Sequence, residues 1–440
     1  MISMNRRSFL HSLASASTAA AAASRRQPNL VLILADDLGY GDLGCYGNSR
    51  SRTPAIDRLA ADGIRFTDFH SNGAVCSPTR AALMTGRYQQ RSGVDEVINA
   101  TTMRDGGLAL SEITLAEALG QAGYTTAMFG KWHLGYDPRF HPDRQGFQEF
   151  RGYVSGNIDY FSHIDQAGYA DWWHNGKAIS EDGYTTELIT RHALDFIDGH
   201  RTMPFFLYLA HASVHYPYQG PNDRALRAAG QKDGGPAGRK DVGATYAAMT
   251  EALDNSVGRV LARLRALPYD RETFVFFCSD NGATPQGSNG VLRGFKAQLW
   301  EGGHRVPAIA CWPGRIPEGR TSGAAALTMD VFPTLLEAAG VKAPDSPALD
   351  GISLFPHLRT GKPLAERTLF WAHGPQRAVR WNDWKLTRMP NQEPWLSDLS
   401  RDLPETTNLA AELPARVADL TARLDRWERS VTLSRITRKE

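Results

Sequence analysis

Residues 29–39 read NLVLILADDLG, an unbroken apolar run that ends in Asp36 and Asp37. An apolar run without polar alternation is typical of a strand that is buried on both faces of a parallel sheet. The two aspartates then lie at the carboxyl end of the strand, which is where α/β sheets place their ligands. Aspartate is also common in turns, and Gly39 and Gly41 indicate that a turn follows in either case. The stretch predicts an α/β fold with a candidate site at this edge of the sheet.

A second run of the same kind, TFVFFC at residues 273–278, is followed one residue later by Asp280 and Asn281. Two strands of one type thus end in Asp-Asp and in Asp-Asn. Adjacent carboxylates repel each other unless a cation lies between them. A set of four oxygen ligands, without sulfur or imidazole, favours Ca²⁺ or Mg²⁺ over zinc. We therefore predict that Asp36, Asp37, Asp280 and Asn281 form a site for a divalent cation.

The composition is that of an ordinary globular protein, with 42% hydrophobic and 22% charged residues among 440. The formal net charge of +2 gives no excess that would indicate a nucleic-acid partner or a membrane surface. No apolar run is long enough to predict a transmembrane helix. The four cysteines, at positions 45, 76, 278 and 311, lack the spacing of a metal site. We expect no nucleic-acid partner and no membrane span.

The amino terminus has the order of parts of an export signal. Residues 6–10 read RRSFL, a twin-arginine pattern, and residues 12–23 form a short run of small and mildly apolar residues. A frayed helix is the alternative interpretation. We predict a twin-arginine signal peptide over residues 1–24, recognised by the twin-arginine export machinery, and hence an exported bacterial protein that is periplasmic or secreted.

The segment VCSPTRAALMTGR at residues 75–87 predicts the start of a helix, with Pro78 in its first turn. A helix start offers unpaired backbone N–H groups and partial positive charge to an anion. Arg80 lies about one turn into this helix and can reach back towards Cys76. The alternative is a small buried cysteine in front of an ordinary helix.

Three further segments place polar groups after strand-like runs. Lys131 and His133 lie in GKWHLG after residues 124–129, and on an extended backbone they point to the same side. His215 lies in HASVHYP after the run at 204–210, together with His211, and Lys296 lies in LRGFKAQLWEGGHRVP. Each of these residues alone would be an ordinary surface group.

Taken in order along the chain, these motifs resemble those of the type I sulfatases, which belong to the alkaline-phosphatase-like superfamily. The resemblance covers essentially the whole chain after the signal, and C-x-P-x-R at 76–80 followed by Thr-Gly-Arg is its most specific part. It implies that a maturation enzyme converts Cys76 to formylglycine, whose hydrate attacks the sulfur of a sulfate ester. The family usually has proline before the matching histidine, where this chain has Val214; the spacing to Tyr216 and Pro217 still favours His215 over His211.

The resemblance also implies a role for each site residue. Calcium, with magnesium less expected, is held by Asp36, Asp37, Asp280, Asn281 and the formylglycine at Cys76. Arg80 and Lys131 stabilise the hydrate. His215, next to Lys296, protonates the leaving oxygen, and His133 takes a proton from the second hydroxyl so that sulfate leaves.

The implied fold is α/β, with a large mixed sheet sandwiched by helices and a smaller C-terminal α/β subdomain that contains a short antiparallel sheet. We expect the catalytic domain at 25–360 and the subdomain at 361–440. Helices are expected at 53–62, 115–121, 187–198, 242–267, 325–340 and 415–428, and long loops at 137–173. With Cys76 converted, the remaining three cysteines allow at most one disulfide.

The predicted activity is sulfate ester hydrolysis by an arylsulfatase-like enzyme, with a sulfated carbohydrate as the expected substrate. The nearest alternative is a formylglycine-dependent phosphodiesterase or phosphonate hydrolase, because phosphate diesters resemble sulfate esters in shape and charge. A non-catalytic protein that binds sulfated glycans is a second alternative. The segments 137–173 and 225–240 are the expected determinants of substrate specificity.

Overall fold

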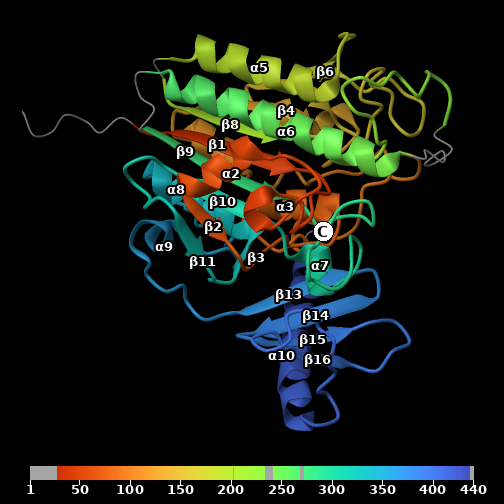
Figure 1. The fold of residues 1–440 in the computed structure, drawn as a ribbon, viewed down its shortest axis with the longest axis vertical. Helices are drawn as coiled ribbons and strands as arrows, with labels where there is room; N and C mark the ends of the chain where they lie inside the picture. The colour runs from red at the N-terminus through yellow and green to blue at the C-terminus, as the bar shows by residue number, and fades with distance from the viewer. Residues whose placement is uncertain (1–26, 202, 233–240, 268–271, 437–440) are drawn as a thin grey trace, which may run out of the picture.

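The computed structural model describes residues 27–201, 203–232, 241–267 and 272–436. The predicted signal peptide at 1–24 lies outside the described residues, as does the stretch 233–240 of one predicted specificity segment. The described residues form a large α/β domain with a smaller subdomain beneath it (Figure 1).

The large domain is built on a ten-stranded mixed sheet. Its strands, in spatial order, are β11 (Arg320–Ser322), β2 (Ile64–Phe66), β10 (Ala308–Cys311), β9 (Thr273–Ser279), β1 (Asn29–Ala35), β8 (Phe205–Ala210), β4 (Thr125–Lys131), β5 (Glu149–Tyr153), β6 (Trp173–His174) and β7 (Lys177–Ala178). The run from β9 to β5 is parallel, whereas β10 is antiparallel to β9. The predicted mixed sheet is therefore confirmed.

The strand β1 lies in the middle of this sheet and is fully buried, as its apolar run predicted. Its side chains alternate between two cores: Leu30, Leu32 and Leu34 enter one, and Val31 and Ile33 enter the other. The continuous apolar run is thus explained by burial on both faces.

Helices cover both faces of the sheet, so the sandwich is confirmed as well (Figure 1). The core that contains Val31 and Ile33 is closed by α2 (Pro54–Ala61), α5 (Thr185–Gly199) and α6 (Val242–Arg265). The core that contains Leu30 is closed by α3 (Cys76–Thr85), α4 (Leu115–Gln121), α8 (Val331–Ala339) and α9 (Phe355–Thr360). The shorter elements of the described part of the chain are β3 (Phe69–His70), α7 (Glu301–His304), β12 (Ala326–Leu327) and 3₁₀ turns at Gly44–Tyr46, Pro138–Phe140, Pro142–Arg144 and Thr328–Asp330.

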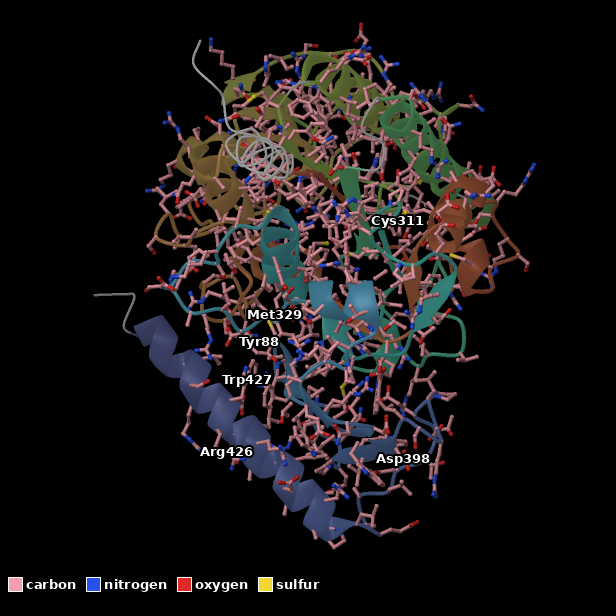
Figure 2. All side chains as sticks on the ribbon, turned by 90° about the vertical axis from the view of Figure 1, so that its left-hand side faces the viewer. Tyr88, Cys311, Met329, Asp398, Arg426 and Trp427 are labelled. Carbon is pink, nitrogen blue, oxygen red and sulfur yellow. The ribbon has the colours of Figure 1, made fainter. Side chains whose placement is uncertain are left out.

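The subdomain is a four-stranded antiparallel sheet with one long helix against it. The strands are β13 (Thr368–His373), β14 (Gln376–Trp381), β15 (Trp384–Arg388) and β16 (Trp395–Asp398), and the helix is α10 (Pro414–Ile436). Trp427 lies on the side of α10 that faces Tyr88 and Met329, whereas Arg426 lies on the exposed side (Figure 2). The Trp427 and Tyr88 rings are 5.3 Å apart, so α10 packs against the large domain as well as its own sheet.

Several boundaries differ from those predicted. The expected helix at 325–340 begins only at Val331, because β12 and a 3₁₀ turn occupy its first residues. The final helix is longer than 415–428, and the expected loop at 137–173 contains β5 and the first residue of β6. His133 has a φ of 57°, so the extended backbone predicted from Lys131 onwards is wrong. Among the described residues no helix is both long and apolar enough to cross a membrane.

A buried charged network joins the subdomain to the large domain. Lys385 on β15 is fully buried, and its Nζ lies 2.9 Å from Glu301 Oε1 and 3.2 Å from Glu405 Oε1. Arg380 on β14 makes two hydrogen bonds of 2.7 Å to the buried carboxylate of Asp68. Glu301 and Asp68 belong to the large domain, so these ion pairs fix the relative position of the two sheets.

None of the four cysteines is joined in a disulfide within the described residues, which contain all four. Cys278 and Cys311 are buried on neighbouring strands, β9 and β10, and pack as small apolar side chains in the two cores.

Candidate active site

The predicted site residues meet at the carboxyl edge of the central strands. Asp36 and Asp37 follow β1, and Asp280 and Asn281 follow β9, which pairs with β1 in parallel. Beyond the end of β8, the chain stays hydrogen-bonded to the segment after β1, because Asp36 N–H donates to Ser213 O at 3.0 Å. That pairing holds the loop after β8, and with it His215, beside the two aspartates. Lys131 is the last residue of β4, Cys76 is the first residue of α3, and Lys296 lies on the loop that precedes α7.

Three carboxylates in this cluster are buried, and a protein cation contacts each of them. Lys131 Nζ lies 2.5 Å from Asp36 Oδ2, and Lys296 Nζ lies 2.6 Å from Asp37 Oδ1. Arg80 lies 2.9 Å from Asp280 Oδ2. Charged groups packed in this way are costly to bury unless they are paired, and here each carboxylate has a lysine or arginine beside it.

The three carboxyl groups respond differently to this environment. Burial, with repulsion from Asp280 and Cys76, raises the pKa of Asp36 well above its usual value. Burial would also raise the pKa of Asp37, but Lys296 and His215 lower it below the ordinary range. For Asp280, Arg80 and Lys131 outweigh burial and lower the pKa. Of the three carboxyl groups, Asp36 is therefore the one whose ionised form is least favoured, because it lies near Asp280 and Cys76.

Cys76 is the first residue of α3, and it is 2% exposed. The preceding residue, Val75, is extended and offers no side-chain cap, so the N-terminal backbone groups of the helix keep their capacity to bind an anion. Cys76 Sγ lies 3.4 Å from Asp36 Oδ1 and 3.4 Å from Lys296 Nζ. The side chain at position 76 thus lies between the carboxylates and a cation.

Arg80 is the most tightly held cation of the site. Its Nε and Nη2 donate to Asp280 Oδ2 at 3.2 and 2.9 Å, and its Nη1 donates to Lys131 O at 2.8 Å. Burial alone would lower the pKa of Arg80, but Asp280 and Asp36 raise it above its ordinary value. The guanidinium is permanently charged, and it connects α3 to β4 and to the end of β9.

Each of the two predicted histidines has one ring nitrogen within hydrogen-bond distance of a backbone carbonyl. His133 Nε2 lies 3.1 Å from Ile98 O, so in the neutral ring Nε2–H donates there and Nδ1 keeps its lone pair. This Nδ1 is buried and has no hydrogen-bond partner among the described residues. His215 Nδ1 lies 2.5 Å from Tyr216 O, which leaves Nε2 facing Asp37 Oδ2 at 3.7 Å.

The electrostatic environment favours the neutral form of both rings. Burial, with Lys131 and Arg80, lowers the pKa of His133 well below its ordinary value. Burial and then Lys296 lower the pKa of His215, although Asp37 and Asp36 oppose the shift. A neutral His133 with an unpaired Nδ1 is equipped to accept a proton.

His211, the alternative considered for the site, is directed elsewhere. It is fully buried, its Nε2 lies 3.3 Å from Ser256 Oγ on α6, and burial lowers its pKa to about 4. His211 thus contacts α6, whereas His215 contacts Asp37.

The residues present fit a hard divalent cation. Asp36, Asp37, Cys76 and His215 each direct one atom into a common space in which the four atoms lie within 4.8 Å of one another. Asn281 Nδ2 donates to Asp37 Oδ1 at 2.8 Å, while its buried Oδ1 has no hydrogen-bond partner in the described part of the chain. A buried amide oxygen without a donor beside three carboxylates is the donor set that Ca²⁺ or Mg²⁺ prefers.

Two positioning residues were missed from the sequence. Asp42 accepts hydrogen bonds from Gly39 N–H at 2.8 Å, Ser288 N–H at 2.8 Å and Tyr246 O–H at 2.6 Å. Asp42 thereby joins the turn after Asp37 to the loop after β9 and to α6. Tyr246 is 204 residues away in the chain, so no local pattern could have indicated the pair.

The profile of the sulfatase family matches residues 28–341, which contain all of these site residues. The chain belongs to the sulfatase family. It is 38% identical over 387 residues to the N-acetylgalactosamine-6-sulfatase of Canis lupus familiaris, which covers 82% of this chain and 71% of the relative. It is 36% identical over 446 residues to arylsulfatase A of Homo sapiens, which covers 89% of this chain and 85% of the relative.

Solved structures agree with this assignment. The structure of Ps i-CgsB in complex with k-i-k-neocarrahexaose has a TM-score of 0.83 and 30% identity, and the match covers 91% of this chain and 93% of that chain. The phosphonate monoester hydrolase of Agrobacterium radiobacter shares the fold, with a TM-score of 0.66 and 22% identity. The predicted sulfatase membership and the alkaline-phosphatase-like fold are confirmed, and the sulfatase is a sulfuric ester hydrolase.

Proposed function

We propose that this sulfatase hydrolyses a sulfate ester of a sulfated carbohydrate, with formylglycine at position 76 and with calcium as its cation. The observation that carries the proposal is the convergence of Cys76 with three buried carboxylates and three cations at one sheet edge. A carbohydrate substrate is supported by the names of the N-acetylgalactosamine-6-sulfatase relative and of the structure in complex with k-i-k-neocarrahexaose.

The cation is assigned to the side chains of Asp36, Asp37, Asp280 and Asn281 and to the residue at position 76. A bound divalent cation supplies charge that stabilises the oxygens of a sulfate group. Formylglycine supplies two hydroxyls on one carbon when it is hydrated, so that one can attack sulfur while the other remains. Magnesium is the less favoured cation, because it requires a more regular octahedral set of ligands.

Each remaining residue has a role that its contacts support. Lys131 and Arg80 hold positive charge beside the Asp36–Asp280 side of the site, where an oxyanion at position 76 would be stabilised. In this proposal His133 accepts a proton at Nδ1, which is buried and has no hydrogen-bond partner in the described residues. Lys296 is the more exposed lysine, at 18% of its side chain, so it is the one that an incoming sulfate meets.

His215 protonates the leaving oxygen in this proposal, which requires its imidazolium form. Lys296 is one of the groups that lower the pKa of His215. An anionic sulfate beside Lys296 offsets that charge, so the binding of substrate itself favours the protonated ring. The 3.7 Å contact with Asp37 acts in the same direction.

The test of the proposed function is a substrate panel with the purified enzyme. We expect turnover of 4-nitrophenyl sulfate, and of at least one of N-acetylgalactosamine 6-sulfate, galactose 6-sulfate and galactose 4-sulfate. Turnover of bis(4-nitrophenyl) phosphate above that of the aryl sulfate would instead support the phosphodiesterase or phosphonate hydrolase alternative. The second alternative, a non-catalytic glycan-binding protein, is disfavoured because Cys76, Lys131 and Asp280 are all retained.

The cation assignment predicts a calcium-dependent gain in stability that Asp280→Ala removes. At a calcium concentration of 100 times Kd, a ligand of the folded state adds about 2.7 kcal/mol to the free energy of unfolding. We expect CaCl₂ to raise the thermal midpoint of the chelator-treated wild type and of the control Asp345→Asn, an exposed aspartate. A calcium response in Asp280→Ala equal to that of the wild type would contradict the assignment.

Two further parts of the proposal concern the ends of the chain. Export by the twin-arginine machinery, with action in the periplasm or outside the cell, rests on the Arg6-Arg7 pattern. The division into a catalytic domain at 25–360 and a subdomain at 361–440 is supported by the start of the separate four-stranded sheet at Thr368.

A further inference from the structure

The turn that carries Lys296 is bonded through its backbone to two segments of the active site. Lys296 N–H donates to Ala283 O at 2.9 Å, and Ala297 N–H donates to Ala74 O at 2.8 Å. Ala283 belongs to the segment after β9 that supplies two of the proposed metal ligands, and Ala74 belongs to the segment directly before α3. These bonds hold the backbone at position 296 between the two segments.

Ala297 has an uncommon backbone conformation for an alanine. Gln298 N–H donates to Phe295 O at 3.1 Å and closes a tight turn with Lys296 at its first central position. Ala297, at the second central position, has a φ of 68°. Glycine is the usual residue there, because a Cβ makes the left-handed conformation costly. Such a conformation persists only where the surrounding structure holds it, so the turn depends on contacts from outside.

Gln376, in the subdomain, supplies two contacts of this kind. Its Nε2 donates to Ala297 O at 2.8 Å, and its Oε1 accepts a hydrogen bond from Leu299 N–H at 3.2 Å. A donor and the acceptor of one side-chain amide are thus both used on the backbone of the Lys296 turn. The bond to Ala297 O fixes the peptide that follows the left-handed residue, so it stabilises that conformation.

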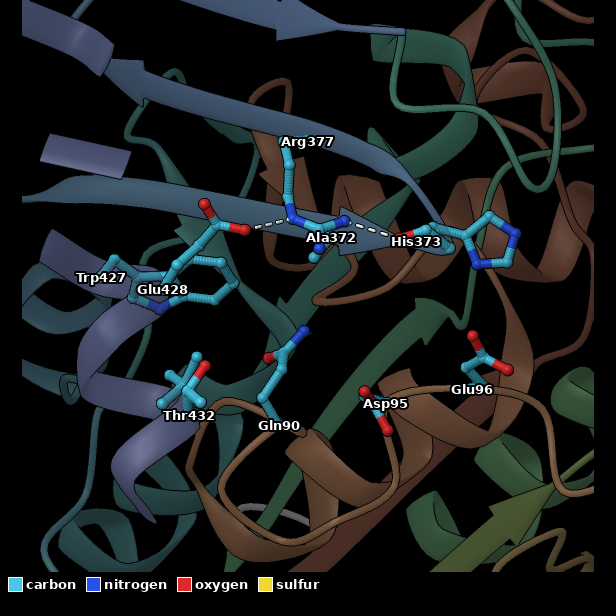
Figure 3. A pocket seen from close by; sticks show the side chains of 11 residues that line it. Gln90, Asp95, Glu96, Ala372, His373, Arg377, Trp427, Glu428 and Thr432 are labelled. Atoms are coloured by element: carbon cyan, nitrogen blue, oxygen red, sulfur yellow. Dashed lines mark hydrogen bonds and ion pairs between the residues drawn. The ribbon is translucent and has the colours of Figure 1, made fainter. Parts of the chain in front are cut away.

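The hairpin that presents Gln376 is itself fixed in place. A two-residue turn joins β13 to β14, and Gly374 in this turn has a φ of 50°, as tight hairpin turns require. Arg377 Nε donates to Glu428 Oε1 at 2.5 Å, and its Nη1 donates to Gly374 O at 2.6 Å. Figure 3 shows Arg377 and Glu428 of α10 beside a pocket that they line together with Gln90. The position of Gln376 is therefore set by its own hairpin and by α10.

We propose that Gln376 is a positioning residue for Lys296, so that the subdomain takes part in the active site. By stabilising the turn, Gln376 holds Lys296 Nζ 2.6 Å from Asp37 Oδ1 and 3.4 Å from Cys76 Sγ. The proposal rests on the proposed function, because it takes Lys296 as the group that meets the sulfate. If the turn relaxes, the ammonium group leaves this position and stabilises the charge on the sulfate less well.

The test is a double-mutant cycle on the full-length enzyme, with the sulfate ester of the panel that is hydrolysed best. Gln376→Leu removes both hydrogen bonds at similar volume, and we expect it to lower kcat/KM about ten-fold. In a Lys296→Ala background the same change should alter kcat/KM by less than about two-fold, because the group that Gln376 positions is absent. A residue that only attached the subdomain would have the same effect in both backgrounds.

A rescue variant tests the role of the turn. Glycine adopts the left-handed conformation without the cost of a Cβ, so adding Ala297→Gly to Gln376→Leu should raise kcat/KM by about three-fold or more. A double variant no more active than Gln376→Leu would overturn the proposal. Gln376→Glu, which lacks the donor for Ala297 O, replaces Gln376→Leu if that variant fails to fold. Gln392→Leu changes an exposed glutamine of the subdomain, and this matched control should keep kcat/KM within about two-fold.

The outcomes separate the two proposals. If Lys296→Ala keeps the kcat/KM of the wild type, the role of Lys296 in the proposed function fails, and the role of Gln376 fails with it. If Lys296→Ala loses activity but Gln376→Leu changes kcat/KM by less than about two-fold, only the positioning role is overturned. That role is also overturned if Gln376→Leu lowers kcat/KM by the same factor with and without Lys296, because Gln376 then acts through the fold as a whole.

Discussion

Replacement of Cys76 by serine is expected to abolish sustained hydrolysis of sulfate esters, with a loss in kcat of roughly a thousand-fold or more. Serine keeps one hydroxyl in the position of Cys76 Sγ, between Asp36 and Lys296. It lacks the second hydroxyl from which His133 would remove a proton, so the sulfated enzyme has no internal route to release sulfate. We therefore expect at most one slow sulfation per enzyme molecule and no further turnover.

The measurement combines steady-state rates with the mass of the tryptic peptide 66–80, which ends at Arg80 and contains position 76. Wild-type protein from its native host should show the mass of formylglycine in place of cysteine. The Cys76→Ser peptide, after incubation with an aryl sulfate, should show an added sulfate group. Turnover of Cys76→Ser at the wild-type rate would rule out the formylglycine route. A wild-type peptide that contains an unmodified thiol in active enzyme would do the same.

Replacement of Lys385 by methionine is expected to lower the free energy of unfolding by about 3–5 kcal/mol. Lys385 is fully buried between Glu301 and Glu405, and its Nζ also lies 3.2 Å from His304 Nε2. Methionine fills a similar volume but removes the cation that Glu301 and Glu405 share, and Glu301 then keeps only Arg305, whose Nη1 lies 3.1 Å from Oε2. Burial would raise the pKa of Glu301, yet Lys385 and His70 hold it well below its usual value. That stabilisation of the carboxylate is lost with the lysine.

Urea denaturation at neutral pH measures this effect, and a double-mutant cycle assigns it. Adding Glu405→Gln to Lys385→Met should recover part of the stability, because a neutral amide replaces the carboxylate that has lost its cation. The control Lys342→Met removes a lysine whose side chain is 80% exposed, and it should change the midpoint little. If both lysine variants lowered the free energy of unfolding by the same small amount, the buried network would not contribute to holding the subdomain against the large domain.

The sequence predicted the parts of the structure that depend on local pattern. The apolar runs at 29–35 and 273–279 became the adjacent parallel strands β1 and β9, and their terminal carboxylates met as expected. Position 76 was placed correctly at the start of a helix because Pro78 suits a first turn. These predictions succeeded because each of them depends on a short segment and on the general geometry of parallel sheets.

The missed features depend on contacts between distant segments. The pairing of Lys385 with Glu301 spans 84 residues, and neither residue has a neighbouring pattern that marks it as buried. The pocket beside Gln90 is formed by three segments from two domains, so no spacing in the sequence reveals it. His133 takes a left-handed conformation although it follows a strand, because β4 ends at Lys131.

The attachment of the β13–β14 turn to Ala297 limits how this protein can be recombined with its relatives. Gln376 bonds the backbone on both sides of Gln298, through Ala297 O and Leu299 N–H, directly after the proposed catalytic Lys296. A chimaera that joined this large domain to a foreign C-terminal part at residue 361 would lose those two bonds and the ion pair between Lys385 and Glu301. A functional exchange of the C-terminal part therefore has to include the 296–305 segment. The segments that must be exchanged together thus extend across the boundary between the two sheets.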